Sequence, residues 1–167
     1  MLDTALDINS YKRDGFELVC KVLPVWTGEW HYTEVCEELM FSDHRSWVYF
    51  IVVNDEIVKI GETGNPLGIR NSRGDFTQPK KGSESRFGRY RAGDQTDAVI
   101  RESLEDWARL GRVTLWARKC DMVEVDIMIA GKPSKTLVTY HKDLEMRYLD
   151  EIYDKTHGYP MLNKARK

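Results

Sequence analysis

The clearest pattern along the chain is a pair of apolar segments separated by a turn signal. Every residue of Trp47–Val53 is aromatic or branched aliphatic, a composition typical of a buried strand. The Asn-Asp pair at 54–55 favours a tight turn, and Glu56–Gly61 then returns as a second apolar segment. This part of the chain therefore predicts a β-hairpin.

Further segments downstream have the periodicity of helices or strands. The Asn-Pro pair at 65–66 predicts the start of a short helix that carries Arg70. Asp97–Leu110 has the pattern of an amphipathic helix. Val113–Trp116 predicts a third strand, and the alternation in Met122–Ile129 predicts a fourth.

The last predicted helix is Lys142–Lys155, and one of its faces carries a mainly apolar stripe of residues. Residues spaced by three and four positions lie on one helix face. That stripe consists of Glu145, Tyr148, Leu149 and Ile152. Glu151 lies off the stripe, so we expect it to point to solvent or to pair locally, whereas Glu145 should point inward.

The first 46 residues are the least regular part of the chain. The apolar run Phe16–Leu23 ends at Pro24, and Thr33–Phe41 has the length of a short helix. We assign 1–46 as an N-terminal extension that contributes dimer or DNA contacts, and 47–167 as the main domain. The class is α+β, with a small antiparallel sheet of three to four strands flanked by helices.

Composition narrows the class of protein further. The chain has 167 residues, of which 41% are hydrophobic and 31% charged, which excludes a disordered or collagen-like chain. No apolar run approaches the roughly 18 residues of a membrane span, and the first ten residues lack the basic residue of a secretory signal. Three cysteines without a C-x-x-C pair indicate a reduced, cytoplasmic protein.

The charge is unevenly distributed along the chain. The net charge is −2, but residues 1–69 hold 5 Lys/Arg against 12 Asp/Glu, whereas residues 70–91 hold 7 against 2. A basic stretch with Gly, Ser and aromatic residues is suited to phosphate and base contacts, although a solvated loop has the same charge. The candidate DNA contacts of this basic loop (residues 70–91) are Arg73, Lys80, Lys81, Arg86, Arg89, Tyr90 and Arg91.

The hairpin carries two short motifs that resemble a known signature. Val48-Tyr49-Phe50 lies on its first strand and Lys59-Ile60-Gly61-Glu62-Thr63 on its second. Arg70, Glu145 and Asn163 follow in that order. Together these residues resemble the marks of the GIY-YIG nuclease superfamily over about residues 47–167.

Two departures from the signature refine the resemblance. The first motif lacks its Gly, and Lys59 stands where the second motif normally has Tyr. This Lys is similar to that of the superfamily's small type II restriction endonucleases. The resemblance implies a sequence-specific endonuclease for double-stranded DNA that uses Mg²⁺, with Mn²⁺ as a substitute. It also implies that the protein forms a homodimer. It implies neither membrane binding nor a nucleotide cofactor.

The chemistry of phosphodiester hydrolysis gives each of these residues a role. Tyr49 would be the general base, and a nearby Lys59 would favour its phenolate. Arg70 would hold the scissile phosphate through two hydrogen bonds. Glu145 would bind the single metal ion, and Asn163 would fix the last loop beside the site.

Other interpretations stay open at this point. Tyr49 alone fits a core aromatic residue, Lys59 fits an edge strand, and Arg70 fits an ion pair with Glu62 or Asp75. Three other functions also remain: a phage or homing-type nuclease of the same superfamily, a DNA-binding module without catalysis, and a zinc hydrolase. The zinc site would use His141, Glu145 and His157.

A shared site requires a particular register in the hairpin. A two-residue turn without a bulge would pair Tyr49 with Ile60 and place Lys59 on the opposite face. We therefore expect a three-residue loop or an equivalent bulge, with Tyr49 opposite Gly61. The three-residue loop would place on one face Tyr49, Ile51, Val53, Ile57 and Lys59. Glu145 should point toward Tyr49, Lys59 and Arg70.

Overall fold

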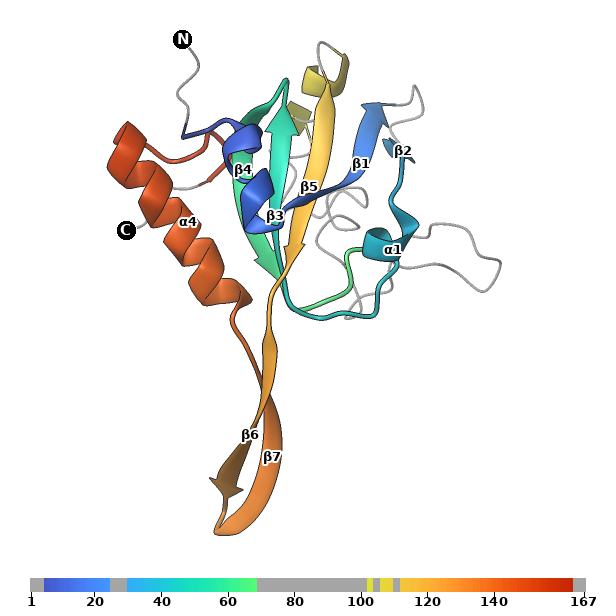
Figure 1. The fold of residues 1–167 in the computed structure, drawn as a ribbon. Helices are drawn as coiled ribbons and strands as arrows, with labels where there is room; N and C mark the ends of the chain where they lie inside the picture. Colours follow the sequence, from blue (N-terminus) through green and yellow to red (C-terminus); the bar gives the residue numbers. More distant parts are fainter. Residues whose placement is uncertain (1–4, 25–29, 69–101, 104–105, 110–111, 164–167) are drawn as a thin grey trace.

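The chain forms an α+β fold in a computed structural model that describes residues 5–24, 30–68, 102–103, 106–109 and 112–163 (Figure 1). The main sheet contains β1 (Glu17–Pro24), β2 (Trp30–Thr33), β3 (Trp47–Val53), β4 (Glu56–Thr63) and β5 (Val113–Lys119). A separate ribbon contains β6 (Met122–Ile129) and β7 (Lys132–Thr139). The helices with both ends described are the 3₁₀ turns η1 (Ile8–Ser10) and η2 (Lys12–Asp14), with α1 (Glu37–Met40) and α4 (His141–Thr156). None of the described helices is long and apolar enough to cross a membrane.

The main sheet is antiparallel, with the strand order β2-β1-β5-β3-β4. The α+β class is confirmed, but the sheet has five strands where we expected three to four. The additional strands are β1 and β2, which come from the segment assigned as an N-terminal extension. β1 pairs with β5, almost 100 residues later in the chain, so no local pattern marks this pairing.

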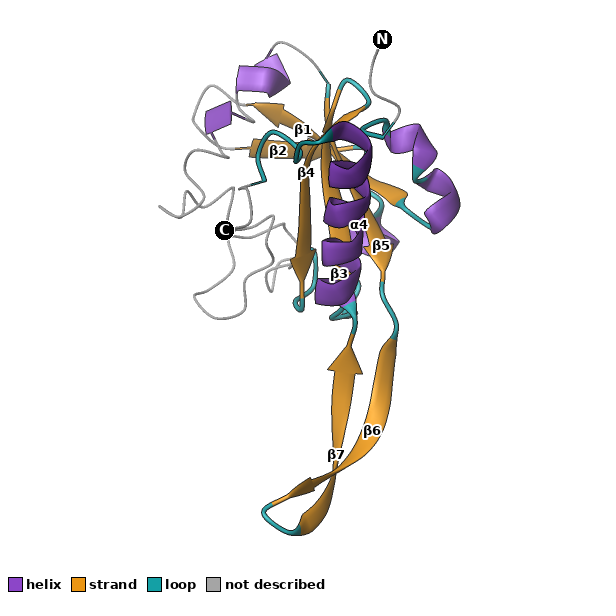
Figure 2. Cartoon of the chain, turned by 90° about the vertical axis from the view of Figure 1, so that its left-hand side faces the viewer, coloured by secondary structure: helices purple, strands orange, loops and turns teal. Residues whose placement is uncertain are grey.

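Both faces of the sheet are covered. Trp47, Tyr49 and Ile51 pack in one core cluster, which includes residues of α1. Val48, Phe50 and Val52 pack in a second cluster on the opposite face, against α4 and the N-terminal turns. Figure 2 shows α4 lying across this second face. Burial on two sides explains why β3 is a continuous apolar segment.

The β3–β4 hairpin contains a bulge, as the shared-site hypothesis requires. Asn54 and Asp55 form a two-residue turn with φ of 49° and 71°, the left-handed conformation of a type I′ turn. Ile51 pairs with Lys59 but Val52 pairs with Ile57, so Val58 is one residue more than β3 can match. Tyr49 consequently lies opposite Gly61, and the expected register around Tyr49 and Lys59 is confirmed.

The expected position of Ile57 is wrong. Ile57 pairs with Val52 and packs in the α4-side cluster, not on the face of Tyr49. The reason is that the additional residue lies within the strand and not in the turn. Residues before the bulge keep the two-residue register, and only residues from Lys59 onward are shifted.

The expected fourth strand of the sheet lies elsewhere. Met122–Ile129 is strand β6, which pairs with β7 in the separate ribbon and not with the main sheet. The sequence pattern missed β7 because Lys132–Thr139 contains Pro133 and two lysines. The turn at 130–131 joins the strands with φ of 50° and 77°.

The outer edge of β4 is covered by segments from both ends of the chain. Near the turn, Ile57 N–H donates to Leu6 O at 2.7 Å, and Ile8 N–H donates to Asp55 O at 3.0 Å. Further along, Leu162 N–H donates to Val58 O at 2.8 Å. These contacts satisfy backbone groups that an edge strand would otherwise expose.

Two predicted helices fall mostly outside the described residues. Within Asp97–Leu110, residues 102–103 and 106–109 are helical, and the rest is not described. The short helix carrying Arg70 also falls outside them. α4 begins one residue before the predicted start and ends one residue after the predicted end. In the N-terminal segment, the helix expected at Thr33–Phe41 is reduced to α1.

Gly61 should be intolerant of any side chain. A Cβ at this position would lie 2.3 Å from Cζ of the Tyr49 ring, and Tyr49 is 1% exposed, so the ring has no free space to enter. We expect Gly61→Ala to lower the free energy of unfolding by about 1–3 kcal/mol, measured by urea denaturation.

The matched control for this change is Gly158→Ala. At Gly158 the nearest atom to a new Cβ is Thr156 Oγ1 at 3.9 Å, an ordinary contact. Its free energy of unfolding should change by less than about 0.5 kcal/mol. Equal stability of the two variants would contradict the close packing of Tyr49 on Gly61.

Candidate functional site

Tyr49 and Lys59 lie on the same face of the hairpin. Because side chains alternate along a strand, residues paired with Gly61 and Ile51 share a side. Lys59 is half-buried on edge strand β4, and Tyr49 is buried at 1% exposure within the core. The bulge thus brings an ammonium and a phenol to one face, and burial makes the tyrosine inaccessible to bulk solvent.

Glu145 lies on α4, which packs on the opposite face of the sheet. The helix contributes Tyr148, Leu149 and Ile152 to the cluster around Phe50, and Glu145, one turn before them, is half-buried. Glu145 and the Tyr49–Lys59 pair therefore belong to elements on opposite faces of the sheet. That Glu145 points toward Tyr49 and Lys59 stays a prediction.

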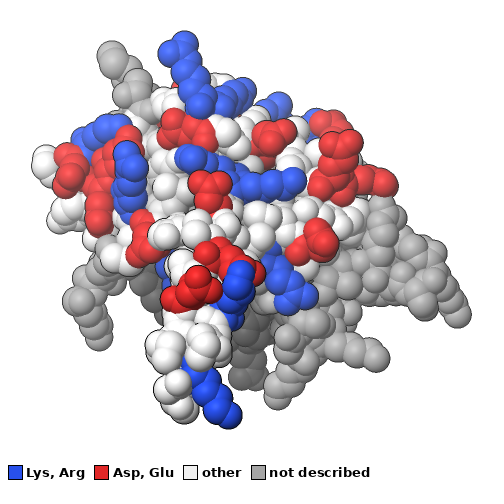
Figure 3. Space-filling view, turned by 60° about the horizontal axis from the view of Figure 1, so that its bottom comes forward, with Lys and Arg blue, Asp and Glu red and all other residues white. Residues whose placement is uncertain are grey.

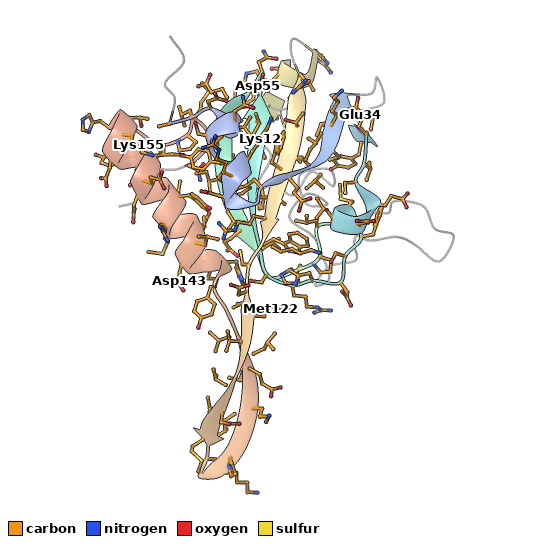
Figure 4. The ribbon with its side chains drawn as sticks, in the orientation of Figure 1. Lys12, Glu34, Asp55, Met122, Asp143 and Lys155 are labelled. Atoms are coloured by element: carbon orange, nitrogen blue, oxygen red, sulfur yellow. The ribbon has the colours of Figure 1, made fainter. Side chains whose placement is uncertain are left out.

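The other glutamate of α4 pairs locally, as expected. Glu151 Oε1 lies 2.5 Å from Lys155 Nζ, one turn along the same helix, and Figure 4 labels this lysine on α4. This is the local pairing predicted from its position off the apolar stripe. Glu151 is half-buried, as Glu145 is, and its carboxylate is paired locally.

His141 connects the start of α4 to the hairpin. Its Nε2 lies 3.1 Å from Glu62 Oε2 on β4, and its Nδ1 lies 3.2 Å from Ser46 Oγ, just before β3. His141 is 7% exposed and Ser46 is fully buried. One imidazole therefore bridges the elements that carry Tyr49, Lys59 and Glu145.

Sequence reasoning missed this role of His141 and Ser46. Glu62 follows Gly61 directly in the second motif, and His141 lies one turn before Glu145. That spacing was available, but it was assigned to a hypothetical zinc site. The contact with Ser46, 95 residues away, has no signal in the sequence.

Asn163 binds the backbone of β4 directly. Its Oδ1 accepts from Ile60 N–H at 2.8 Å, and its Nδ2 donates to Ile60 O at 2.7 Å. The side-chain amide thus pairs with one residue of the strand edge as a neighbouring strand would. This contact anchors the C-terminal loop one residue from Lys59.

The expected phosphate-binding residues lie outside the described residues. Arg70 and the entire basic loop fall in the undescribed segment 69–101. The residues concerned are Arg70, Arg73, Lys80, Lys81, Arg86, Arg89, Tyr90 and Arg91. Their roles in holding DNA stay predictions.

The geometry argues against the zinc-hydrolase alternative. His141 and His157 lie at opposite ends of α4, about 24 Å apart along a helix of that length. Among the described residues, no group of three or more His, Cys, Asp or Glu side chains could hold a metal ion. His141 instead contacts Ser46 and Glu62.

The thiols are also poor candidates for nucleophiles. Burial raises the pKa of both Cys20 and Cys120 above the ordinary value of a thiol. A raised pKa leaves less of the reactive thiolate near neutral pH. These two cysteines are therefore core residues.

Two solved structures resemble this arrangement of strands and helices. The restriction endonuclease HPY188I, solved in complex with product DNA, superimposes with a TM-score of 0.53 at 17% identity and covers 95% of this chain and 87% of that chain. A mutant of EndoII from bacteriophage T4 superimposes with a TM-score of 0.59 at 16% identity. That match covers 95% of this chain and 98% of the EndoII chain. This chain shares their fold.

Comparison of the amino-acid sequence alone identifies no relative of this chain. No protein-family model matches the chain, and no curated protein is similar to it in sequence. At 16–17% identity the two structures establish the fold. The GIY-YIG resemblance stays a prediction from the motifs on the hairpin.

The His141 bridge should contribute measurably to stability. His141→Ala leaves the buried Ser46 hydroxyl and the Glu62 carboxylate without the imidazole. Unsatisfied buried polar groups cost about 1–3 kcal/mol each, so we expect a loss of free energy of unfolding in that range, measured by urea denaturation.

His157→Asn is the matched histidine control. His157 has φ of 54° at the end of α4, a conformation that Asn tolerates well. Its stability should stay within about 0.5 kcal/mol of the parent. If both histidine variants lose stability equally, the bridge is not responsible for the effect.

Proposed function

We propose that this protein is a metal-dependent endonuclease that cuts double-stranded DNA, of the type II restriction class. The observation that carries the proposal is the bulge in β4, which places Tyr49 and Lys59 on one face. A second support is the fold shared with a restriction endonuclease and with a phage EndoII. The motif residues were identified from the sequence independently of that fold.

The roles proposed for the residues follow from phosphodiester chemistry. Tyr49 takes the proton of the attacking water, and Lys59 stabilises the phenolate through its positive charge. Arg70 holds the scissile phosphate. Asn163 keeps the C-terminal loop on β4 beside Lys59, through its two hydrogen bonds to Ile60.

The donor set fits a magnesium ion held mainly by substrate and water. Mg²⁺ typically binds one or two carboxylates together with phosphate oxygens and waters, and Glu145 is a half-buried carboxylate on α4. Glu145 would be the protein ligand. When bound, Mg²⁺ or Mn²⁺ would neutralise charge on the phosphate and stabilise the departing 3′ oxygen.

The burial of Tyr49 places a condition on this mechanism. At 1% exposure its hydroxyl meets neither water nor phosphate until the side chains over it move. The proposed reaction therefore requires the Tyr49 face to open before water and phosphate can reach this hydroxyl. The same burial favours a second candidate function, a DNA-binding module that does not cleave.

The cellular setting and assembly complete the proposal. The described cysteines are all free, in keeping with a reducing cytoplasm. One active site of this kind cuts one strand, so a double-strand break calls for a two-fold homodimer. No nucleotide cofactor is part of the reaction.

Plasmid cleavage tests the function directly. Purified protein is incubated with phage-lambda DNA and supercoiled plasmid in Mg²⁺. Discrete fragments support a restriction enzyme, whereas a smear would replace it by a nuclease without sequence preference. DNA that is bound in a gel-shift assay but stays intact in both Mg²⁺ and Mn²⁺ would overturn the proposal in favour of the DNA-binding module.

Two carboxylates of α4 provide a matched pair of variants. Glu145→Gln keeps the side-chain shape but removes the charge that a hard cation needs, so cleavage should fall on the order of 100-fold or more. DNA binding, measured by gel shift in Ca²⁺, should be retained. Glu151→Gln loses only its pair with Lys155, and cleavage should stay within a few-fold.

A stability measurement separates loss of the metal ligand from loss of the fold in the Glu145 variant. Urea denaturation of both glutamate variants shows whether either has lost stability. Fully active Glu145→Gln enzyme would mean that the metal ligand has been assigned to the wrong residue.

The basic loop should contribute binding but no chemistry. Lys80→Ala or Arg86→Ala removes one phosphate contact, so the slope of log affinity against log salt should become shallower by about 0.9. Lys155→Ala, whose side chain pairs with Glu151 on α4, is the matched control and should leave the slope unchanged. An unchanged slope in the loop variants would exclude the basic loop from the DNA interface.

A further inference from the structure

The first turn of α4 is attached to the sheet differently from the turns that follow it. Tyr148, Leu149 and Ile152 are each at most 7% exposed and pack in the α4-side cluster, so mainly apolar contacts fix the middle of the helix. Within residues 141–145, only His141 is buried; the next two residues are exposed and the last two are half-buried. The one fully buried side chain of the first turn is therefore polar.

The imidazole of His141 is held at both of its nitrogens. Nε2 lies 3.1 Å from Glu62 Oε2, and Nδ1 lies 3.2 Å from Ser46 Oγ. An ionised carboxylate can only accept hydrogen bonds, so Nε2 carries the proton of the neutral imidazole and donates to Glu62. The Ser46 hydroxyl then donates to Nδ1, and the two contacts together set the orientation and the tautomer of the ring.

Ser46 is itself held firmly at the end of the main sheet. It is 0% exposed, and its carbonyl accepts from Cys120 N–H at 2.8 Å. The Cys120 carbonyl lies 3.0 Å from His44 Nε2, and Trp47 Nε1–H donates to His44 O at 2.8 Å. These contacts join the start of β3 to the end of β5, so the hydroxyl of Ser46 has a fixed place beside the imidazole.

Glu62 connects the imidazole to the strand that carries Lys59. It lies three residues after Lys59 on β4 and pairs with Val48, a member of the α4-side cluster, so Glu62 faces α4. On α4, residues four positions apart lie on one helix face, which places Glu145 next to His141 along the helix. One hydrogen bond thus links the strand of Lys59 to the turn that carries the proposed metal ligand.

The β6–β7 ribbon leads directly into this turn. β7 ends at Thr139 and α4 begins at His141, and Figures 1 and 2 both show the ribbon extending beyond the main sheet and α4. With 8 residues in each strand, the ribbon is about 26 Å long. A displacement of the ribbon therefore reaches the first turn of α4, where the two contacts of His141 resist it.

The surface charges near the ribbon do not fix the position of this turn. Figure 3 shows acidic and basic side chains interspersed over the described surface at this end of the molecule. The pocket at the base of the ribbon is lined by charged residues of both signs, namely Arg118, Lys119, Asp121, Asp143 and Arg147. Opposite charges so close together largely cancel at a distance, which leaves the short-range contacts of the imidazole.

We propose that His141 is a positioning residue: its hydrogen bond to Glu62 holds the first turn of α4, and with it Glu145, in a fixed place relative to the strand of Lys59. Ser46 orients the imidazole for this contact. The proposal rests on the proposed function, because the position of Glu145 affects the reaction only if Glu145 binds the metal ion. His141 acts through Glu145 and takes no part in the chemical step.

Conservative variants separate the two contacts of the imidazole. The amide nitrogen of His141→Gln lies near the place of Nε2 and can still donate to Glu62, whereas the shorter His141→Asn reaches only Ser46. Glu62→Ala removes the acceptor, and Glu62→Gln keeps one. Thr156→Val is the matched control, because Thr156 Oγ1 donates to Ile152 O at 2.9 Å at the other end of α4.

Hydrogen exchange, followed by NMR, measures the attachment of the first turn without reference to cleavage. Leu144 N–H donates to Tyr140 O at 3.0 Å, and the amide of Glu145 follows in the helical ladder. Exchange of these two amides should speed up at least about tenfold in His141→Asn and in Glu62→Ala. The two Gln variants and the control should stay within about twofold of the parent. Unchanged exchange in His141→Asn would overturn the proposal.

Single-turnover cleavage measures the consequence for Glu145. His141→Asn and Glu62→Ala should cut on the order of 10–100-fold more slowly and need at least about tenfold more Mg²⁺ for half-maximal rate, because contacts that orient a metal ligand typically have effects of this size. DNA affinity, measured by gel shift in Ca²⁺, should be retained. The double variant should cut no more slowly than His141→Asn alone, because both changes remove the same contact.

Stability is controlled in the same experiment. Urea denaturation identifies a temperature at which every variant is folded, and all rates are measured there. His141→Gln, Glu62→Gln and the control should then cut within a few-fold of the parent. An equal loss of cleavage in His141→Gln and His141→Asn would show that the contact with Glu62 is not responsible, and would overturn the proposal.

The remaining outcomes separate this role from the proposed function. Faster exchange in His141→Asn with unchanged cleavage and unchanged Mg²⁺ dependence would overturn the positioning role while leaving the endonuclease intact. A parent protein that never cuts DNA, but whose exchange depends on the Glu62 contact as expected, would support the attachment of Glu145 and refute the endonuclease.

Discussion

The two-residue period of a β-strand is the constraint on which the candidate site depends. In a hairpin with a two-residue turn and no irregularity, Tyr49 and Lys59 would lie on opposite faces of the sheet. The additional residue in β4, Val58, shifts every later residue by one position relative to β3. The bulge thus moves Lys59 and Gly61 to the side of Tyr49, and it leaves Ile57 in the α4-side core. Gly61 in turn leaves room for the tyrosine ring.

The outer edge of β4 is where the rest of the site is assembled. Leu162 and Asn163 bind its backbone from the C-terminal loop. Glu62 binds His141 at the first residue of α4. An edge strand has free hydrogen-bonding groups, so segments from distant parts of the chain can dock on it without disturbing the sheet. The proposed ligand Glu145 lies one helical turn beyond this contact.

The shared fold and the chain's own residues support the nuclease proposal in different ways. The two structural neighbours establish an architecture, and the same architecture can host different chemistry. The register of Tyr49 and Lys59 and the burial of Tyr49 are observed in this chain itself.

The sequence by itself determined the features that depend on neighbours along the chain. The hairpin followed from the composition of Trp47–Val53 and the turn at 54–55, and α4 with its locally paired Glu151 followed from helical spacing. Even the need for an irregularity in the hairpin could be argued, because alternation is a local property. The sequence did not show whether that irregularity lay in the turn or in the strand.

Only the tertiary structure decided which distant segments meet. β1 joins the sheet beside β5, β6 leaves it to pair with β7, and His141 bridges Ser46 and Glu62. Each of these contacts joins residues whose local patterns are compatible with several partners. The choice is made by the packing of the whole core and by the need to satisfy buried polar groups, and both depend on the complete three-dimensional arrangement.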